Sequence, residues 1–476
     1  MSDILPHDFK NNIELYQYLR ELYGDNLSSF LNARPEPTAV RVNTLKYSAR
    51  KFLNDLKKYK LQYQQIPFNA NGFIIENSDF KLSHTLGFFK GHFQYQGISS
   101  QIPVLILSPK QGDVVLDMAA APGSKSTQMA LMMENKGRLY LNDFSRARLT
   151  SLNANVQRSG ICNTVTMQIS GERIGNLFPE KFDKILLDAP CTALGGIAES
   201  DELFIWWSQK KLKSLAARQL RMFISAFKAL KIGGEIVYST CSIAPEENEM
   251  IVQYMLDHYP LDIMPVKTDA FKNFSGGLTR YKEFDFSSSM EEALRIDPGA
   301  HQLEGFFIVK LRKSARSNMM SIKPGDRAEI QTMAHNELAP ELSAISDQWG
   351  IRNDIWENFR YIRSRKRIWM VNKEIKSIPK DGFTSAGLKL AEKRSSVWRL
   401  SNQSAQFFSE FITNRKMNIS KIKLKELFST GYSNLPAVEN GYHALQWEND
   451  IIAVVYAENQ SIRLRLPHYF SLPEII

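Results

Sequence analysis

The stretch "VVLDMAAAPGSKSTQ" (residues 114–128) joins a short apolar run to a helical pattern through a turn of small residues. A buried strand, a tight turn and a helix in this order form the first half of a βαβ unit. Outward from it, short apolar runs alternate with amphipathic runs over residues 104–313, as in "GRLYLND", "FDKILLDAP" and "GGEIVYST". This alternation predicts an α/β fold with a doubly wound, mostly parallel, Rossmann-like sheet.

The regions on either side differ from it in composition. Residues 1–103 contain the helical run "NNIELYQYLRELYG" and the alternating run "TAVRVNTLK", which predict a small N-terminal α/β region. Residues 314–350 are polar, and we expect a linker with a short helix there. Residues 351–476 are rich in lysine and arginine and end in strand-like runs, so they predict a small, basic, β-rich domain. A chain of 476 residues is long enough for several cores.

The charge balance favours a polyanionic partner. The chain carries 60 Lys and Arg against 50 Asp and Glu, a formal net charge of +10 at pH 7. Nucleic acid is the first expectation and a membrane surface the second. The run "RYIRSRKR" at residues 360–367 could bind phosphates, or it could be a solvated face, as most charge runs are. We expect nucleic-acid binding from the basic domain as a whole.

Hydropathy and cysteine content argue against other classes of protein. Mean hydropathy is −0.30, and no apolar run approaches the length of a membrane span. The first residues, "MSDILPHDFK", lack the basic and apolar segments of an export signal. Three cysteines are too few for a disulfide framework. We therefore expect a monomeric cytoplasmic protein with reduced thiols and no membrane partner.

The small-residue turn after the first strand is a candidate ligand site, with Asp117 at the end of that strand. Small residues let a ligand approach the backbone closely, and the following helix start offers N–H groups to an anion. The pattern is neither G-x-G-x-x-G nor G-x-x-x-x-G-K-[ST], so the ligand need not carry a diphosphate. The carboxylate of a small metabolite would suit this helix start. The candidate contacts are Ala119, Ala120, Ala121, Pro122, Gly123, Ser124 and Lys125.

Asp143 ends the next predicted strand, "GRLYLND". Taken alone, this acid could be a turn residue or a helix cap. An acid in this position after a small-residue turn also suits a ribose diol, and we favour that interpretation. An adenosine with a carboxylate-bearing tail would fit both features, with its ribose at Asp143 and its carboxylate at the helix start after the small-residue turn. The sequence therefore predicts S-adenosylmethionine as the cofactor, and no metal site.

Two of the three cysteines follow predicted strand ends. Cys191 comes after "FDKILLDAP", which contains Asp188, and Cys241 comes after "GGEIVYST". The carboxyl ends of parallel strands meet at one edge of a sheet, so we expect both thiols beside the ligand cleft. Free cysteines are more often small buried hydrophobes, and we keep that interpretation for Cys162.

Two thiols and an acid beside S-adenosylmethionine suit methylation of a pyrimidine at C5. C5 is a poor nucleophile, but a thiolate that adds to C6 lets C5 accept a methyl group. Asp188 near N3 can stabilise the adduct by hydrogen bonding or proton transfer. A helix that starts at Pro245 would help to lower the pKa of the Cys241 thiol.

The motifs "DMAAAPGSKSTQ", "LLDAPC" and "YSTCSIAPEENE" occur in the order found in the RNA cytosine-C5 methyltransferases of the Nop2/Sun family. The chain resembles that family from about residue 35 to residue 313, including "RVNTLK" and "EGFFIVKLRK". Its basic C-terminal extension looks PUA-like, and the layout is most similar to bacterial members that act on small-subunit rRNA. By this resemblance, residues 1–103 and 351–476 would bind RNA, with small-subunit rRNA expected ahead of tRNA.

The resemblance implies a role for each matched residue. Cys241 would be the nucleophile, Cys191 would assist adduct breakdown and product release, and Asp188 would contact the cytosine. The small-residue turn would line the methionine end of S-adenosylmethionine. Asp143 would bind its ribose, and Arg148 matches a basic position near the cofactor.

Two stretches depart from the family pattern. "QISGERIG" has Ser170 where the family usually has an acid for the adenine, so Ser170 is the candidate contact there, with Glu172 just beyond. After Cys191 the family is usually glycine-rich and then basic, but this chain reads "TALGGIAESDE", which is acidic. This loop should approach the RNA, so we expect it to bear on target choice or activity.

Three alternatives stay open. A DNA cytosine-C5 methyltransferase would use Cys191 as the nucleophile, although the Thr-Cys motif and the basic extension argue against it. The same chemistry could act on tRNA. A non-catalytic RNA-binding assembly factor on the same scaffold is also compatible with the altered loop after Cys191.

Overall fold

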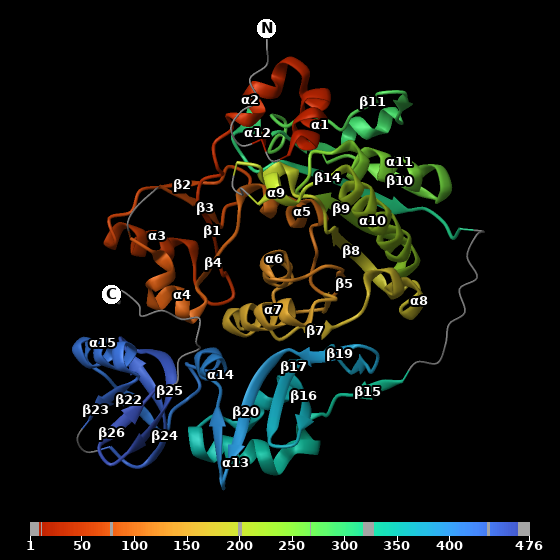
Figure 1. The fold of residues 1–476 in the computed structure, drawn as a ribbon. Helices are drawn as coiled ribbons and strands as arrows, with labels where there is room; N and C mark the ends of the chain where they lie inside the picture. Colours follow the sequence, from red (N-terminus) through yellow and green to blue (C-terminus); the bar gives the residue numbers. More distant parts are fainter. Residues whose placement is uncertain are drawn as a thin grey trace.

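The computed structural model describes residues 9–10, 12–76, 80–198, 202–266, 268–317, 328–435 and 438–464. A central mixed sheet lies between an N-terminal part and a C-terminal part (Figure 1). Helices α1 (Ile13–Tyr23) and α2 (Leu27–Leu31) lie at the end of the molecule opposite the two C-terminal sheets, with the central sheet between them (Figure 1).

The central sheet contains strands from residues 114–313 and one strand, β19, from the C-terminal part. They are β5 (Val114–Asp117), β6 (Arg138–Asn142), β7 (Thr164–Met167), β8 (Phe182–Asp188), β9 (Leu230–Thr240), β10 (Leu261–Met264), β13 (Leu294–Ile296), β14 (Phe306–Lys313) and β19 (Phe383–Ala386). The order is β10-β14-β9-β8-β5-β6-β7-β19, with β13 beside β14. Strands β5 to β9 are parallel, and the other four join antiparallel. The prediction of a mostly parallel sheet is confirmed.

Helices cover both faces of this sheet. They are α5 (Ile98–Leu107), α6 (Ser124–Met132), α7 (Arg146–Ser159), α8 (Ile174–Leu177), α10 (Gln209–Ala229) and α11 (Glu249–His258). Val115 of β5 lies in one core with α5, α6 and α7, and Leu116 lies in the opposite core with α10 and α11. A strand buried on both faces needs such a continuous apolar run. In the described ranges, no helix combines the length and apolarity that a bilayer crossing requires.

The strand order reverses at β5. Strands β6 and β7 lie on one side of it, and β8 and β9 lie on the other. The carboxyl ends of β5 and β8 therefore lie at the topological switch point of the sheet. Ligands bind at this position in open α/β sheets.

The N-terminal part consists, in its described residues, of four α-helices and a separate antiparallel sheet with the order β2-β3-β1-β4. Its elements are α1 (Ile13–Tyr23), α2 (Leu27–Leu31), β1 (Ala39–Val42), α3 (Ala49–Lys58), β2 (Tyr63–Gln65), β3 (Gly72–Ile75), α4 (Leu86–Lys90) and β4 (Phe93–Tyr95). Asn12 starts α1 by accepting a hydrogen bond from the Leu15 N–H, and its amide donates to the Trp207 carbonyl at 3.0 Å. Helices α1 and α2 share a core with Leu194 and Ile243, so they cover the loops after both cysteines.

The C-terminal part contains two sheets, with the orders β16-β17-β20-β21 and β22-β24-β25-β26-β23. Its strands are β16 (Phe359–Ser364), β17 (Arg367–Asn372), β20 (Leu388–Arg394), β21 (Val397–Leu400), β22 (Lys416–Asn418), β23 (Tyr432–Asn434), β24 (Gly441–Trp447), β25 (Asp450–Glu458) and β26 (Ser461–Arg463). Its helices are α13 (Ala339–Trp349), α14 (Asn402–Phe407) and α15 (Lys421–Thr430). The remaining short elements are α9 (Leu203–Trp206), α12 (Pro298–His301), β11 (Arg280–Tyr281), β12 (Phe284–Asp285), β15 (Glu329–Gln331) and β18 (Ser377–Pro379).

Two features of the C-terminal part differ from the sequence prediction. Helix α13 lies in the predicted linker 314–350, but Ile345 and Trp349 pack in the same core as Trp356 and Tyr361. The middle of that interval, 318–327, lies outside the described residues. Strand β19 leaves the predicted C-terminal domain and pairs with β7 of the central sheet. An unpaired edge strand exposes backbone N–H and C=O groups, and β19 covers them on β7.

Lys46 connects three parts of the chain. Its ammonium donates to the Lys90 carbonyl, to the Arg158 carbonyl at 3.1 Å and to Gln406 Oε1 at 3.0 Å. Burial lowers the pKa of Lys46 to about 7, and the nearby charges of Lys90 and Arg158 act in the same direction. Lys90 also forms an ion pair with Asp450. The N-terminal sheet, helix α7 and the C-terminal part are therefore held together by polar contacts as well as apolar ones.

Candidate active site

The two predicted thiols meet at the carboxyl ends of β8 and β9. These strands are parallel neighbours, with Asp188 opposite Ser239 in register. Cys191 and Cys241 therefore leave the sheet side by side, and their Sγ atoms lie 3.3 Å apart. Both are free and partly exposed, whereas Cys162 is buried. The hydrogen bond with Cys241, together with burial, raises the pKa of the Cys191 thiol well above its ordinary value.

Glu247 holds the loop that carries Cys191. Its buried carboxylate accepts hydrogen bonds from Thr192 N–H at 2.9 Å, from Thr192 Oγ1 at 2.5 Å and from the Gln219 amide at 2.9 Å. Gln219 also donates to the Pro190 carbonyl at 2.9 Å. Burial raises the pKa of Glu247, and these donors act in the opposite direction. The sequence did not single out Glu247; the available signal was its place among the three glutamates of the run "SIAPEENEM".

Asn248 holds the loop that carries Cys241. Its side chain accepts from Thr240 Oγ1 at 2.6 Å and donates to the Ser242 carbonyl at 2.9 Å. These two partners stand directly before and after Cys241 in the sequence. Asn248 therefore clamps the backbone on both sides of the thiol.

The loop after Cys191 closes onto the Cys241 loop. Gly195 N–H donates to the Cys241 carbonyl at 3.0 Å, and Gly305 N–H donates to the Gly195 carbonyl at 2.9 Å. A Cβ on Gly195 would lie 2.0 Å from the Gly305 carbonyl oxygen, so only glycine fits there. The acidic end of this loop, at residues 199–201, lies outside the described residues.

Asp188 is held by two side chains. Lys125 Nζ lies 2.8 Å from one of its oxygens, and Ser239 Oγ donates to the other at 2.7 Å. Lys125 also donates to Ser100 Oγ at 2.9 Å. Burial alone would lower the pKa of Lys125, but the Asp188 carboxylate raises it above its ordinary value. The sequence assigned Lys125 to the cofactor carboxylate, whereas the structure joins it to the acid beside the thiols.

Asp117 lies buried at the end of β5, under the small-residue turn. It accepts a hydrogen bond from Ser126 Oγ at 2.6 Å. Burial raises the pKa of Asp117 to about 7, the Asp188 charge adds to this shift, and Ser126 and Lys125 oppose it. The charges of both Lys125 and Asp188 therefore influence the pKa of Asp117.

We expect Asp117→Asn to remove a pH dependence of folding stability. Between about pH 4 and 7, folded Asp117 retains a proton that the unfolded chain has lost, so the free energy of unfolding falls as pH rises. The contribution of Asp117 to this fall should be about 3 kcal/mol in the wild type and absent in the variant. Urea unfolding at several pH values measures it. Asp262→Asn, at an exposed acid, should keep the wild-type slope, and an unchanged slope in Asp117→Asn would contradict the assignment.

The small-residue turn from Ala119 to Gly123 leads into helix α6, which begins at Ser124. Gly123 has φ +109°, and a Cβ there would lie 2.9 Å from Leu152 Cδ1. The Ala121–Pro122 peptide bond is cis. Because the turn lies between the end of β5 and the start of α6, its backbone and small side chains lie at the switch point of the sheet, beside the N–H groups of the first helical turn.

Asp143 lies buried against this turn, after β6. Its oxygens accept from the Ala121 N–H at 3.3 Å and the Ser145 N–H at 2.8 Å. Arg148 lies 3.5 Å from the same carboxylate and donates to the Ala121 carbonyl. A carboxylate has about four acceptor positions, so Asp143 retains capacity for a diol. The structure thus brings Asp143 and Arg148 together at the turn.

Ser170 follows β7 on the neighbouring loop, and its hydroxyl binds Glu172, which also lies 3.5 Å from Arg218. Asn142, which the sequence did not single out, donates to the Met118 and Ile169 carbonyls at 3.1 and 2.9 Å. It therefore ties the loops after β5, β6 and β7 together. In the sequence, Asn142 is marked only by its position directly before Asp143, at the end of the apolar run "GRLYLND".

A Rossmann-like sheet with this turn, strand-end acids and paired thiols defines a methyltransferase. The profile of the family described as "16S rRNA methyltransferase RsmB/F" matches residues 104–312. The ribosomal RNA small subunit methyltransferase F of Vibrio cholerae serotype O1 (strain M66-2) is 32% identical over 453 residues, which cover 90% of each chain. The chain belongs to the RsmB/F methyltransferase family and is an rRNA methyltransferase that uses S-adenosyl-L-methionine.

Solved structures show the same fold. A methyltransferase homolog from Pyrococcus horikoshii has a TM-score of 0.57 and 35% identity, over 63% of this chain and 94% of that one. The NSun6 protein of Pyrococcus horikoshii, crystallised with SFG, has a TM-score of 0.55 and 27% identity, over 64% of this chain and 98% of that one. The predictions of a Rossmann-like methyltransferase fold and of S-adenosyl-L-methionine as the cofactor are confirmed.

Proposed function

We propose that this protein transfers a methyl group to C5 of a cytosine in small-subunit rRNA. The observation that carries the proposal is the 3.3 Å contact between Cys191 and Cys241 at two neighbouring strand ends. C5 methylation of a pyrimidine needs a nucleophile for C6 and a way to release the adduct. Two thiols in contact can divide these two tasks between them. Transfer of a methyl group to a nitrogen or oxygen atom needs neither a nucleophile for carbon nor a group that releases an adduct.

Cys241 is the proposed nucleophile. Its thiolate adds to C6, a S–C6 bond forms, and the electron pair of the C5–C6 double bond becomes available at C5. Asn248 fixes the backbone on both sides of Cys241, which keeps the thiolate aimed at one position. Asp188 contacts the cytosine near N3 and stabilises the adduct, and Lys125 and Ser239 hold its carboxylate in place.

Cys191 is the proposed group for adduct release. Before reaction, the contact with Cys241 keeps Cys191 protonated. When Cys241 sulfur is bonded to carbon, this influence on the pKa of Cys191 is lost, and Cys191 can give its proton to solvent. The thiolate then takes the proton from C5, the C5–C6 double bond re-forms, and the S–C6 bond breaks to release Cys241.

The residues around the small-residue turn are the proposed cofactor site. S-adenosyl-L-methionine, when bound, supplies the methyl group. Its carboxylate-bearing end would lie against the turn at Ala119–Gly123 and the start of α6 at Ser124. Asp143 would bind the ribose and Arg148 would flank it, while Ser170 is the proposed contact on the adenine side. Asp117 would support the turn from below through Ser126.

The target in rRNA is proposed on the similarity to the Vibrio cholerae protein, whose name specifies the small ribosomal subunit. The N-terminal part and the PUA-like C-terminal part would bind RNA outside the target cytosine, and this substrate would place the reaction in the cytoplasm. A cytosine inside a helix must leave its stack to reach the thiols, so a loop or an opened helix is the expected site.

Replacing Cys191 with alanine should trap the proposed intermediate. Cys241 can still add to C6, but the adduct lacks the group that removes the C5 proton. A protein–RNA band that survives denaturing gel electrophoresis should accumulate when the variant is incubated with rRNA and S-adenosyl-L-methionine. Cys162→Ala is the matched control, because Cys162 is buried away from the site and should give no such band.

The alternatives give different outcomes. A trapped band with Cys241→Ala and none with Cys191→Ala would make Cys191 the nucleophile. Absence of both a band and methyl transfer with intact rRNA would support a non-catalytic assembly factor. A band with tRNA and none with small-subunit rRNA would move the same chemistry to tRNA.

A further inference from the structure

The sheet β22-β24-β25-β26-β23 carries a row of aromatic and basic side chains. Tyr442 on β24 pairs with Tyr456 on β25, Tyr456 pairs with Arg463 on β26, and Arg463 pairs with Tyr432 on β23. Directly opposed residues in antiparallel strands share one face of a sheet. These four residues, which we call the Tyr–Arg face, therefore form one continuous row. Tyr432 and Tyr456 are 40% and 39% exposed.

The Tyr–Arg face borders a pocket of about 280 Å³ between the two C-terminal sheets. On β25, Val454 is buried in the core that the two sheets share, whereas Tyr456 and Glu458, on the same side of the strand, are exposed. The pocket thus opens where the sheet β16-β17-β20-β21 stops covering its neighbour. Strands β20 and β21 contribute Arg394 and Arg399 to the opposite wall.

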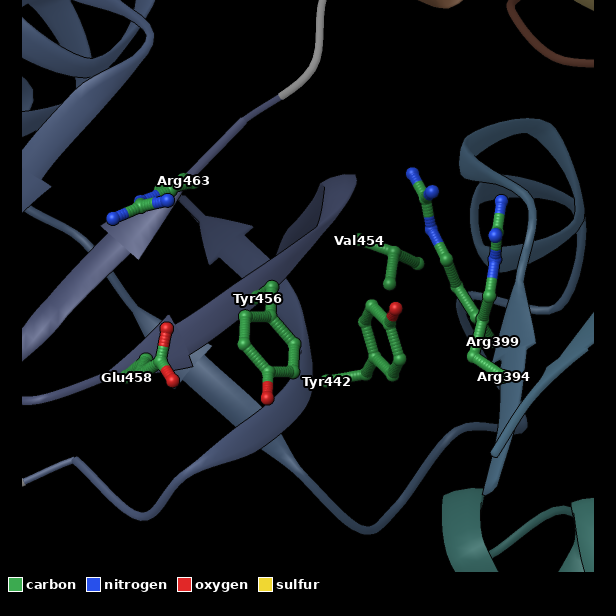
Figure 2. A pocket seen from close by; sticks show the side chains of 7 residues that line it. All are labelled: Arg394, Arg399, Tyr442, Val454, Tyr456, Glu458 and Arg463. Carbon is green, nitrogen blue, oxygen red and sulfur yellow. The ribbon is translucent and has the colours of Figure 1, made fainter. Parts of the chain in front are cut away.

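Guanidinium groups lie on both sides of the tyrosine pair. Figure 2 shows the rings of Tyr442 and Tyr456 between Arg463 on one side and Arg394 and Arg399 on the other. The two rings are 5.0 Å apart and tilted by 60°, and Arg399 lies 5.8 Å from the Tyr442 ring. Arg394 also contacts Glu392 at 3.0 Å. Among the described residues that line the pocket, three are arginines and one, Glu458, is an acid, so this lining carries a net positive charge.

We propose that the Tyr–Arg face and its pocket bind an unpaired stretch of RNA outside the target cytosine. A base would stack on the exposed ring of Tyr456 or Tyr432, and the arginines would contact the flanking phosphates. This inference rests on the proposed function, because it names the form of RNA that the C-terminal part takes. The proposed ligand is single-stranded RNA, because the bases of a duplex are stacked on one another and cannot stack on a tyrosine ring on the face of a sheet.

The pairing of aromatic rings with arginines favours RNA over an acidic peptide. Arginines alone would suit any anion, but exposed tyrosines spaced along a sheet offer flat apolar surface for successive bases. Because stacking and charge both contribute, removing each should change RNA binding in a different way. Removing a ring should weaken binding at every salt concentration, and removing an arginine should reduce the dependence of binding on salt.

Binding of fluorescein-labelled decauridylate to the full chain, measured by anisotropy, tests the proposal. Tyr456→Ala should weaken binding roughly fivefold or more, and Tyr456→Phe, which keeps the ring, should bind like the wild type. Tyr254→Ala is the matched control, because Tyr254 is also 39% exposed but lies on α11 of the catalytic region. Arg463→Gln should lower the slope of log affinity against log salt by about 0.7.

Three results would overturn the proposal. In the first, Tyr456→Ala binds decauridylate as tightly as Tyr254→Ala does. In the second, the arginine variant alone loses affinity, so that the pocket is an anion site only. In the third, a ten-residue polyglutamate peptide displaces the RNA at equal concentration. Trapping by Cys191→Ala at saturating rRNA, repeated with Tyr456→Ala added, should persist, so failure here is distinguishable from failure of the catalytic proposal.

Discussion

Replacing Cys241 with alanine is expected to lower the rate of methyl transfer by at least about 1000-fold, because C6 then has no nucleophile. The same change should abolish the trapped protein–RNA band when it is combined with Cys191→Ala. Transfer of a labelled methyl group to small-subunit rRNA measures the first effect, and denaturing electrophoresis measures the second. RNA affinity should stay near the wild-type value, since Cys241 is a small part of the RNA contact.

Cys162→Ala provides the comparison for this experiment. Burial raises the pKa of Cys162 to about 12, and its side chain lies in the core of the C-terminal part. This variant should keep full activity per folded molecule and lose only stability. If Cys241→Ala retained more than a few per cent of the wild-type rate, covalent attack by Cys241 would be excluded.

Replacing Glu247 with leucine should have the second large effect, on both stability and catalysis. The change removes the acceptor of the buried Thr192 N–H and one of the two acceptors of the Gln219 amide, which keeps only the Pro190 carbonyl. Unpaired buried donors cost about 1–3 kcal/mol each, so the free energy of unfolding should fall by roughly 3 kcal/mol. The loop that carries Cys191 should also lose its position, which would slow turnover by about 100-fold.

Two further variants separate positioning from stability. Glu247→Gln keeps one acceptor oxygen and the side-chain size, so it should recover most of the stability and part of the rate. Glu246→Gln is the neighbouring control, because an amide oxygen can still accept the hydrogen bond that the Tyr18 hydroxyl gives at 2.7 Å. A Glu247→Leu protein that is destabilised but releases adduct at the wild-type rate per folded molecule would make Glu247 a purely structural residue.

The central fold could be predicted because its signals are local. The run "VVLD" has three consecutive apolar residues before Asp117, as a strand with helices on both faces requires, and the structure buries all four residues. β19 carried no comparable signal. Its sequence "FTSA" is short and mixed, and it is a strand of the central sheet because β7 has a free edge beside it.

The site could be predicted only in outline. Parallel strands direct their carboxyl ends to one edge, so Cys191 and Cys241 could be placed near each other from the strand pattern alone. The pairing of Lys125 with Asp188 could not be derived in this way. It depends on the angle at which α6 leaves the turn, and the same lysine on another rotamer would point to the cofactor instead.

Residue types and their spacing by themselves determined the α/β class, the small-residue turn, the cofactor and the two thiols. Only the tertiary structure decided that Glu247 holds the Cys191 loop, that α13 belongs to the C-terminal core, and that tyrosines and an arginine from four strands share a face. The physical reason is the range of the forces involved. Periodicity and turn chemistry act over a few residues, whereas the burial of a carboxylate or the alignment of side chains across strands depends on segments that only folding brings together.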